Sequence, residues 1–130
     1  ALAVLFESGM PMMGDYSETY NGTDVYSFYR SIPSLKQKTL FLGGQPDFYY
    51  CGAVQTEKYW FVGAINSLFE DEVTVDFSFL DDGKYKAEIF VDADEAGKSI
   101  TKTVETVTKN DVKTFKMFAK GGFVIRLTKQ

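Results

Sequence analysis

The stretch that decides the fold class is "EVTVDFSFLDDGKYKAEIFVD", residues 72–92. Apolar and polar residues alternate on both sides of Asp82-Gly83: the apolar ones are Val73, Val75, Phe77 and Phe79 before it, and Tyr85, Ala87, Ile89 and Val91 after it. Period-two alternation predicts strands with one buried face, and an Asp-Gly pair between two such runs is typical of a β-hairpin turn. We therefore predict a hairpin over residues 72–92.

The same β pattern continues from Leu35 to the end of the chain. Short apolar runs separated by turn residues predict a β-sandwich or a barrel, and we expect an antiparallel two-sheet sandwich of Greek-key type. "YWFVGAI" and "GFVIRL" are apolar on both faces, as in central strands, whereas "SITKTVETV" is polar on both faces, as in an exposed edge strand. Eight candidate strands follow: residues 36–42, 47–55, 58–66, 72–80, 84–92, 99–107, 112–119 and 122–128.

Residues 1–32 have a helical character instead. "ALAVLFES" contains good helix formers, and Gly9 and Pro11 end that run. "TDVYSFYRSI" spaces its apolar residues as one face of a helix does, with Thr23 as the expected N-cap. The Asn21-Gly22-Thr23 sequon is interpreted as a polar turn between the two short helices. Because the chain opens within an apolar run, we expect it to be a fragment of a longer protein.

Composition narrows the class of protein. The chain has 130 residues, of which 45% are hydrophobic, 25% charged and 16% aromatic, which is the balance of one globular domain. A net charge of −4 with scattered signs argues against a nucleic-acid partner, which would favour a basic face. No apolar run is long enough to span a membrane, and no signal peptide is found. Cys51 has no partner for a disulfide and is interpreted as a small buried hydrophobe.

The sequence contains few of the residue patterns that catalysis or metal binding requires. The sequence lacks histidine, which removes Ser-His-Asp and Cys-His catalysis and the common zinc ligand sets. "DADEAG", residues 92–97, begins like an EF-hand loop with Asp92 and Asp94, but Ala96 and Thr103 stand where two ligands are needed. We interpret it as a solvated turn, and the other carboxylates as solvated side chains of turns and strand faces. We expect no catalytic, cofactor-binding or metal-binding residue in this segment.

An aromatic cluster leaves a second hypothesis open. Trp60 with Tyr49, Tyr50 and Tyr59 offers flat rings on which a pyranose could stack. Trp60 lies within the apolar run "KYWFVGAIN", however, so packing in the core or between domains is the preferred interpretation.

Several phrases together resemble a known family. "YWFVGAIN", "VDFSFLDDGKYKAEIFVDADEA" and "KGGFVIRLTK", in this order, are similar to the C-terminal domain of glycoside hydrolase family 97, the α-glucosidases and α-galactosidases of Bacteroides-type bacteria. "AVLFESGMPMMGDY" resembles the last helix of that family's catalytic barrel and the segment after it. The resemblance implies that residues 1–34 are the helical tail of an upstream (β/α)₈ barrel and that residues 35–130 form the C-terminal β-sandwich.

The resemblance also implies a role. In this family the catalytic carboxylates and a calcium ion belong to the barrel and the N-terminal domain, upstream of Ala1, so none is carried over to this chain. We expect a non-catalytic domain that packs on and stabilises the barrel of an α-glycosidase; the alternative is a carbohydrate-binding module, and an autonomous small glycosidase ranks last. Family habit implies a periplasmic, outer-membrane or secreted parent protein. Substrate, stereochemistry and oligomeric state are not determined by these residues.

Overall fold

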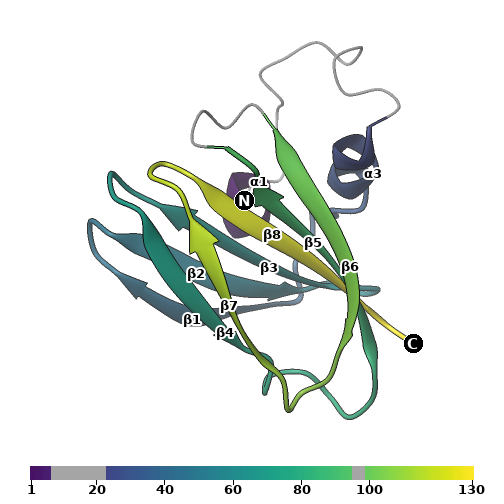
Figure 1. Cartoon of the computed structure of the whole chain (residues 1–130). Coiled ribbons are helices and arrows are strands. Elements are labelled where there is room, and N and C mark those ends of the chain that lie inside the picture. Colours follow the sequence, from purple (N-terminus) through teal and green to yellow (C-terminus); the bar gives the residue numbers. More distant parts are fainter. Residues whose placement is uncertain (7–22, 95–98) are drawn as a thin grey trace.

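The structure, a computed structural model, describes residues 1–6, 23–94 and 99–130. Within these ranges the chain forms a two-layered β-sandwich with short helices on one side (Figure 1). The elements are α1 (Leu2–Leu5), α3 (Asp24–Arg30), β1 (Lys38–Gln45), β2 (Tyr49–Gln55), β3 (Trp60–Asn66), β4 (Asp71–Asp76), β5 (Tyr85–Asp92), β6 (Ile100–Val107), β7 (Val112–Met117) and β8 (Gly122–Lys129). The predicted fold class, an antiparallel sandwich of about eight strands, is confirmed.

The larger sheet has six strands in the order β1-β2-β3-β8-β5-β6, and the smaller has β4 paired with β7. Strands β3 and β8 occupy the middle of the larger sheet, as their apolar sequences predict. Strand β6 lies at its edge, where its polar side chains discourage further pairing. All observed pairings between strands are antiparallel.

The hairpin predicted for residues 72–92 is wrong. Strand β4 pairs with β7, whereas β5 pairs with β6 and β8 in the other sheet. Strand β4 ends at Asp76, whose Oδ1 accepts a hydrogen bond from Ser78 N at 2.8 Å, and residues 77–84 then carry the chain across to the second layer. Apolar and polar residues do alternate in both β4 and β5. The apolar faces of these two strands, however, face each other across the core instead of lying side by side in one sheet.

The core lies between the sheets. Alternate residues of β3, β8 and β5 face inward and meet β4, β7 and the crossing segment. Phe77 and Leu80 of that segment are buried, so it belongs to the core although it forms no strand. The largest fully buried side chains of this core are Phe77, Phe123, Met117, Ile125, Leu127, Val62, Val75, Val107 and Cys51.

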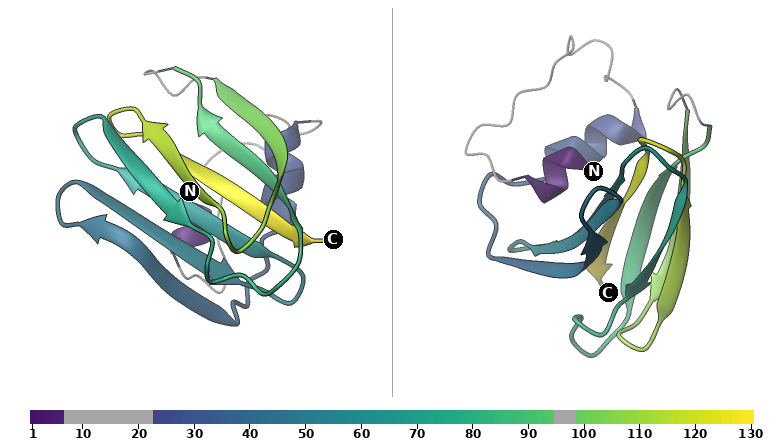
Figure 2. Two further views of the ribbon diagram at one scale, coloured as in Figure 1. Left: turned by 60° about the horizontal axis from the view of Figure 1, so that its bottom comes forward. Right: turned by 90° about the vertical axis from the view of Figure 1, so that its left-hand side faces the viewer.

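Both described helices lie against the other face of the six-stranded sheet, which we call the outer face (Figure 2, right). The predicted N-cap is confirmed: Thr23 Oγ1 accepts a hydrogen bond from Tyr26 N at 3.2 Å, and Asp24 lies in the first turn of α3. Glu7, Gly9, Pro11, Asn21 and Gly22 lie outside the described residues. No helix in the described part of the chain is long and apolar enough to cross a membrane.

Candidate functional site

The outer face carries a second, smaller hydrophobic cluster that joins the helices to the sheet. It is formed by Val4 of α1, Phe28 of α3, and Val54, Phe61 and Phe90 of strands β2, β3 and β5. The ring of Phe28 meets those of Phe61 and Phe90 edge to face, with centroids 5.6 and 5.1 Å apart, an arrangement that aromatic rings prefer. The helices are therefore packed elements of this molecule rather than loosely attached ones.

Helix α1 can lie close to the sheet because two paired glycines beneath it have no side chains. Gly63 of β3 pairs with Gly52 of β2, and a Cβ placed on Gly63 would lie 3.1 Å from Leu5 Cγ. Lys36 fixes the end of the helix, since its Nζ donates to Val4 O at 2.8 Å and to Phe6 O at 2.7 Å. A lysine bound to the last carbonyls of a helix satisfies groups that otherwise lack a partner.

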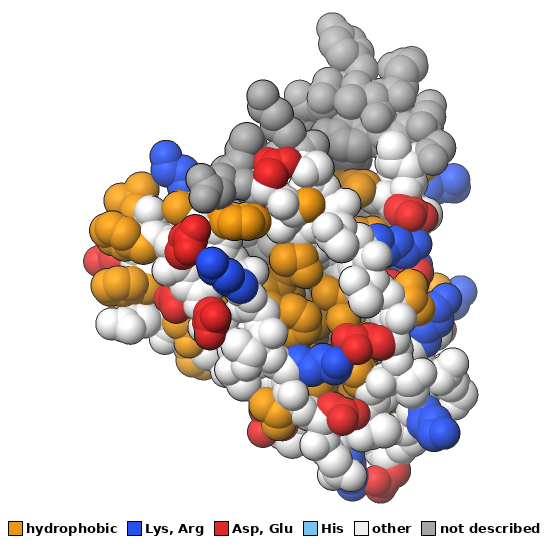
Figure 3. Space-filling model, in the orientation of Figure 1, with side chains coloured by type: hydrophobic (Ala, Val, Ile, Leu, Met, Phe, Trp, Pro, Cys, Tyr) orange, Lys and Arg blue, Asp and Glu red, His pale blue; other side chains and the backbone are white. Residues whose placement is uncertain are grey.

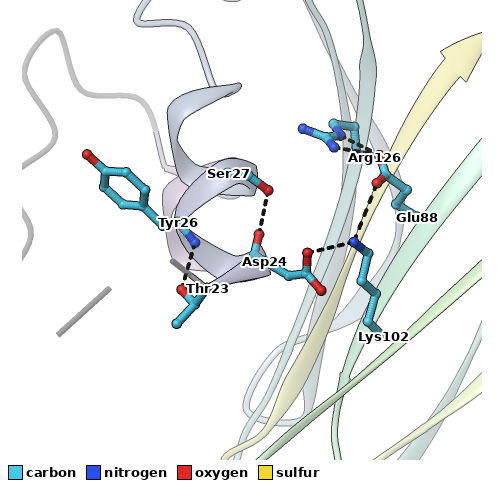
Figure 4. A network of polar contacts seen from close by, with 7 residues as sticks. All are labelled: Thr23, Asp24, Tyr26, Ser27, Glu88, Lys102 and Arg126. Carbon is cyan, nitrogen blue, oxygen red and sulfur yellow. Dashed lines mark hydrogen bonds and ion pairs between the residues drawn. The ribbon is translucent and has the colours of Figure 1, made fainter. Parts of the chain in front are cut away.

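Helix α3 is held by a chain of charges that begins at Asp24 (Figure 4). Lys102 Nζ of β6 lies 3.0 Å from Asp24 Oδ1 and 3.8 Å from Glu88 Oε1 of β5. Arg126 of β8 donates from Nε at 2.8 Å and from Nη2 at 2.6 Å to Glu88 Oε2. Alternating charges thus run from the helix to the middle of the sheet.

Glu88 is the one charged side chain that is buried among the described residues, with 7% of its surface exposed. It is the cross-strand partner of Arg126, whose guanidinium carbon also lies 5.5 Å from the ring centroid of Tyr59 and 6.0 Å from that of Phe28. A carboxylate enclosed by two cations and aromatic rings has its charge compensated. We interpret this group as structural rather than as an acid or a base.

A second feature lies at one end of the sandwich, where the β1–β2 turn and the β3–β4 loop come together. An open hollow of about 510 Å³ lies there, lined by side chains of both connections and of strands β1 to β3. Large apolar side chains remain uncovered around it, and we call these residues the turn-end patch: Phe41, Phe48, Tyr50, Leu68 and Phe69. Figure 3 shows hydrophobic side chains gathered at this end, at the left of the view.

The aromatic residues singled out in the sequence do not form one platform. Trp60 is buried, with its ring centroid 5.0 Å from that of Phe79, which confirms the core interpretation. Tyr59 packs beside Phe61 in the cluster under the helices. Neighbours Tyr49 and Tyr50 both line the hollow but come from opposite faces of β2.

The structure describes only part of the loop after β5, which the sequence predicts to be a solvated turn. Asp92 Oδ2 accepts a hydrogen bond from Gly122 N at 2.8 Å, and Asp94 is bonded by Ser99 Oγ. Residues 95–98, which include Ala96 and Gly97, lie outside the described residues. No group of three or more Asp, Glu, Cys or His side chains within the described ranges is arranged to hold a metal ion.

Cys51 lies in the core, as expected of a small hydrophobe. Burial raises the pKa of its thiol to about 12, since the low-polarity surroundings disfavour the charged form. A thiol that keeps its proton is a poor nucleophile.

Sequence reasoning missed both the charge chain and the turn-end patch. Glu88 and Arg126 are 38 positions apart, and only the pairing of β5 with β8 brings them together. The patch had a weak signal, because Leu68 and Phe69 are large apolar residues in a connection between strands, where solvent is expected.

Comparison with known proteins gives a consistent result. Residues 36–128 match the model of the family described as "Glycosyl-hydrolase 97 C-terminal, oligomerisation". A retaining alpha-galactosidase of Bacteroides thetaiotaomicron is 28% identical over 131 aligned positions, which cover 98% of this chain and 20% of that protein. The chain thus spans about a fifth of this relative.

Solved structures show the same fold. A glycoside hydrolase family 97 enzyme from Pseudoalteromonas sp. strain K8, in complex with acarbose, superposes with a TM-score of 0.90 at 24% identity, covering 99% of this chain and 22% of that one. A beta-arabinopyranosidase superposes less closely, with a TM-score of 0.63 at 18% identity, covering 86% of this chain and 18% of that one. At these identities the likeness concerns the fold of the segment.

Proposed function

Because this chain belongs to the family of glycosyl-hydrolase 97 C-terminal domains, we propose that it is the non-catalytic C-terminal part of a larger α-glycosidase, an α-glucosidase or α-galactosidase. Its role is to pack against the catalytic domain and stabilise it. Residues 1–34 would be the helical tail of that catalytic barrel, and residues 35–130 the sandwich.

The observation that carries the proposal is the helix-bearing outer face. Helix α1, described over Leu2–Leu5, packs on strands β2 and β3 of the larger sheet. Its inner side is fixed on Gly63, while Leu2, Phe6 and the nearby Leu35 expose large apolar side chains. An apolar surface continuous with such a helix suits a further domain of the same chain.

The test is truncation of the longer protein that carries this chain. Removing residues 36–130 is expected to lower its melting temperature and its soluble yield. A finer version replaces Phe6 with serine in the intact protein, with Val112→Ser as the control, because Val112 is similarly exposed but lies in the smaller sheet. If the truncated and intact proteins have the same melting temperature and yield, the proposal fails.

The second candidate function is carbohydrate binding on exposed aromatic rings. The observation in its favour is the open hollow with the rings of Phe41 and Tyr50, whose centroids lie 5.6 Å apart. Trp60 is buried and Tyr59 is partly buried against the cluster under the helices, so neither ring belongs to this surface. Titration of the 130-residue chain with maltooligosaccharides and galactosides, followed by nuclear magnetic resonance, decides between the two: stabilisation of a barrel alone predicts no shift changes.

The proposal extends to cofactor and location. Calcium and the catalytic carboxylates would belong to the part of the protein before Ala1, so chelation is expected to leave the melting temperature of this chain unchanged. The parent protein would be periplasmic, attached to the outer membrane or secreted, which cell fractionation tests. Only the family membership supports this location.

A further inference from the structure

Two aromatic side chains on the outer face lie along their strands instead of standing away from the sheet. Phe41 of β1 pairs with Gly52 of β2, which in turn pairs with Gly63 beneath α1. In the same ladder Tyr50 pairs with Gly44. A Cβ placed on Gly52 would lie 3.2 Å from Tyr50 Cε1, and one placed on Gly44 would lie 3.2 Å from a ring carbon of Phe41. Each ring therefore covers a glycine of its own strand.

We call the rings of Phe41 and Tyr50 the ring platform. Their centroids lie 5.6 Å apart with the ring planes inclined by 47°, and the two residues are 66% and 37% exposed. The face of an aromatic ring carries negative potential. A pyranose ring presents weakly positive C–H groups on its less polar face, and these are attracted to such a surface. Rings that are already positioned lose little conformational freedom on binding.

The ring platform is part of the open hollow at the turn end. Its volume of about 510 Å³ lies within the range of about 300–1,000 Å³ that is typical of ligand pockets. The β1–β2 turn supplies one wall with Pro46 and Phe48, and Ile65 of β3 adds to the lining. The turn is ordered, since Phe48 N donates to Gln45 O at 3.0 Å and Ser67 N donates to Phe48 O at 2.8 Å. The hollow is therefore a preformed recess with room for a small ligand.

Polar groups that suit sugar hydroxyls line the same hollow. The side chains of Gln45 and Asp47 and the hydroxyl of Tyr50 make no hydrogen bond or ion pair with the described part of the chain. A carboxylate accepts hydrogen bonds from two hydroxyls, and an amide both donates and accepts. Asp47 has a φ of +67°, a conformation that glycine adopts more easily. The turn itself thus gives no reason for a carboxylate at this position.

The charge of the hollow limits the class of sugar. Among the described residues that line it, Asp47 is the one charged side chain, and none is a lysine or an arginine. A uronic acid or a sulfated sugar would bring a second negative charge next to this carboxylate without a cation to compensate it. Neutral hexose units are therefore the class that fits.

We infer that the hollow binds a short neutral oligosaccharide, with one pyranose ring stacked on Phe41 and Tyr50 and its hydroxyls bonded by Asp47 and Gln45. This inference rests on the second candidate function, carbohydrate binding, and specifies the site, the class of sugar and the residues that hold it. It is compatible with packing against a catalytic domain, because α1 and α3 lie on other parts of the outer face.

The experiment is titration of the isotope-labelled 130-residue chain with three sugars, followed by nuclear magnetic resonance. Maltotriose and melibiose are the neutral probes, and trigalacturonic acid is the acidic one. The neutral sugars are expected to shift the backbone resonances of Gly44 and Tyr50, and the acidic sugar to leave them unchanged. In the longer protein, a trifluoromethyl label on Pro46→Cys reports on the same hollow by fluorine resonance, separately from any sugar bound at the catalytic site.

Variants test the residues that hold the sugar. Tyr50→Ala is expected to raise the dissociation constant about tenfold, since it removes half of the ring platform. Phe69→Ala is the matched control, because Phe69 is also an exposed aromatic residue of the turn-end patch but does not line the hollow. Asp47→Gly is expected to weaken binding by about the same factor, since it removes a charged acceptor while glycine readily adopts the positive φ. Melting temperatures establish that all three variants are folded.

Each other outcome overturns the inference. If the neutral sugars leave Gly44 and Tyr50 unshifted, or the acidic sugar shifts them equally, the hollow does not select neutral sugars. If Phe69→Ala weakens binding as much as Tyr50→Ala, the ring platform is not the site. A fluorine label that stays unshifted in the longer protein shows that the rest of that protein covers the hollow. All of these results leave the truncation test of the proposed function unaffected, so failure of one is distinguishable from failure of the other.

Discussion

At Gly63 the central strand β3 has no side chain, and Leu5 of helix α1 occupies the space. Glycine within a strand is destabilising by itself, because it has no side chain to pack and its backbone loses more conformational entropy on folding. Here it permits a helix to lie directly on the sheet. The residue is thus explained by what it contacts outside its own strand, and this contact gives a sharp prediction.

Gly63→Val is expected to lower the free energy of unfolding by about 1–3 kcal/mol, because the new methyl groups would overlap Leu5 and Val4 and displace α1. Urea unfolding followed by tryptophan fluorescence measures the change. Gly43→Val is the control: the nearest atom to its added Cβ is Tyr49 Oη, at an ordinary 3.5 Å. Equal losses for the two variants would show that the space above Gly63 is not specifically occupied.

Cys51 gives a prediction about pH. Its pKa is raised from 9.0 to about 12 in the folded chain, so the unfolded chain loses the thiol proton first as pH rises. The stabilising contribution is complete below pH 9 and is lost as pH rises from about 9 toward about 12. We expect the free energy of unfolding to fall more steeply over this window in the natural chain than in Cys51→Ala. Urea titrations of both proteins at matched pH values give the two free energies of unfolding. If the two free energies fall equally with pH, the burial of Cys51 does not have this effect.

At the scale of single elements, the sequence predicts strand positions well and their partners poorly. Alternation in residues 72–92 correctly marks β4 and β5, and the apolar and polar characters of β3, β8 and β6 correctly indicate central and edge positions. Alternation records only which face of a strand is buried. It does not record whether the next strand lies beside it or across the core, and so the hairpin prediction failed.

Gly83, in the segment that crosses between the sheets, has a φ of +127°, which side chains strongly disfavour. Gly83→Ala is expected to cost about 1–2 kcal/mol of folding free energy, although little of the space around it is filled. Lys120→Gly provides the contrast, because Lys120 already has a positive φ of +61° and glycine relieves that conformation. Thermal unfolding of both variants tests the pair, and a harmless Gly83→Ala would contradict the backbone argument.

The chain of charges under α3 predicts non-additive losses. Arg126→Met leaves Glu88 buried without its bidentate partner and is expected to cost about 2–4 kcal/mol. Replacing both residues, as Glu88→Leu with Arg126→Met, is expected to recover most of that loss, since no buried charge is left alone. Lys102→Met serves as the comparison and should cost about 1 kcal/mol or less, because Asp24 is largely exposed and Glu88 keeps its closer partner Arg126. A double variant no more stable than Arg126→Met would exclude this account.

The candidate surfaces were less predictable than the strands for the same physical reason. Glu88 and Arg126 look like ordinary polar-face residues until the topology places β5 next to β8. The turn-end patch needs two connections to meet, and connections carry no periodic pattern that fixes their neighbours. Residues whose role is local, such as Thr23 at the start of α3 and Cys51 in an apolar strand, were correctly predicted.

At the scale of the whole molecule, the helices and the sandwich share a hydrophobic cluster although residues 1–34 and 35–130 were assigned to different domains. That boundary stays a prediction, and the packing suggests how to test it. Residues 35–130 alone would expose Val54, Phe61 and Phe90, which α1 and α3 cover in the intact chain. We expect this piece to melt at a lower temperature, to bind a hydrophobic dye and to aggregate.

A chain that begins at residue 23, and so keeps α3 while losing α1, should show an intermediate melting temperature. Differential scanning fluorimetry of the three lengths gives the comparison. Should residues 35–130 melt at the same temperature as the full chain, the shared cluster would contribute nothing to stability, and the helices would belong to another domain in energetic terms as well.

The position of β8 has a consequence for how the protein is made. It follows every other described strand in chain order, yet it lies in the middle of the larger sheet, between β3 and β5. While the chain is being synthesised, the ribosome releases seven strands that cannot yet join: β1 to β3 form one ribbon, β5 and β6 another, and each has an unsatisfied inner edge. The larger sheet closes only when β8 emerges. Deletion of β8 would therefore separate the two ribbons rather than shorten the sheet.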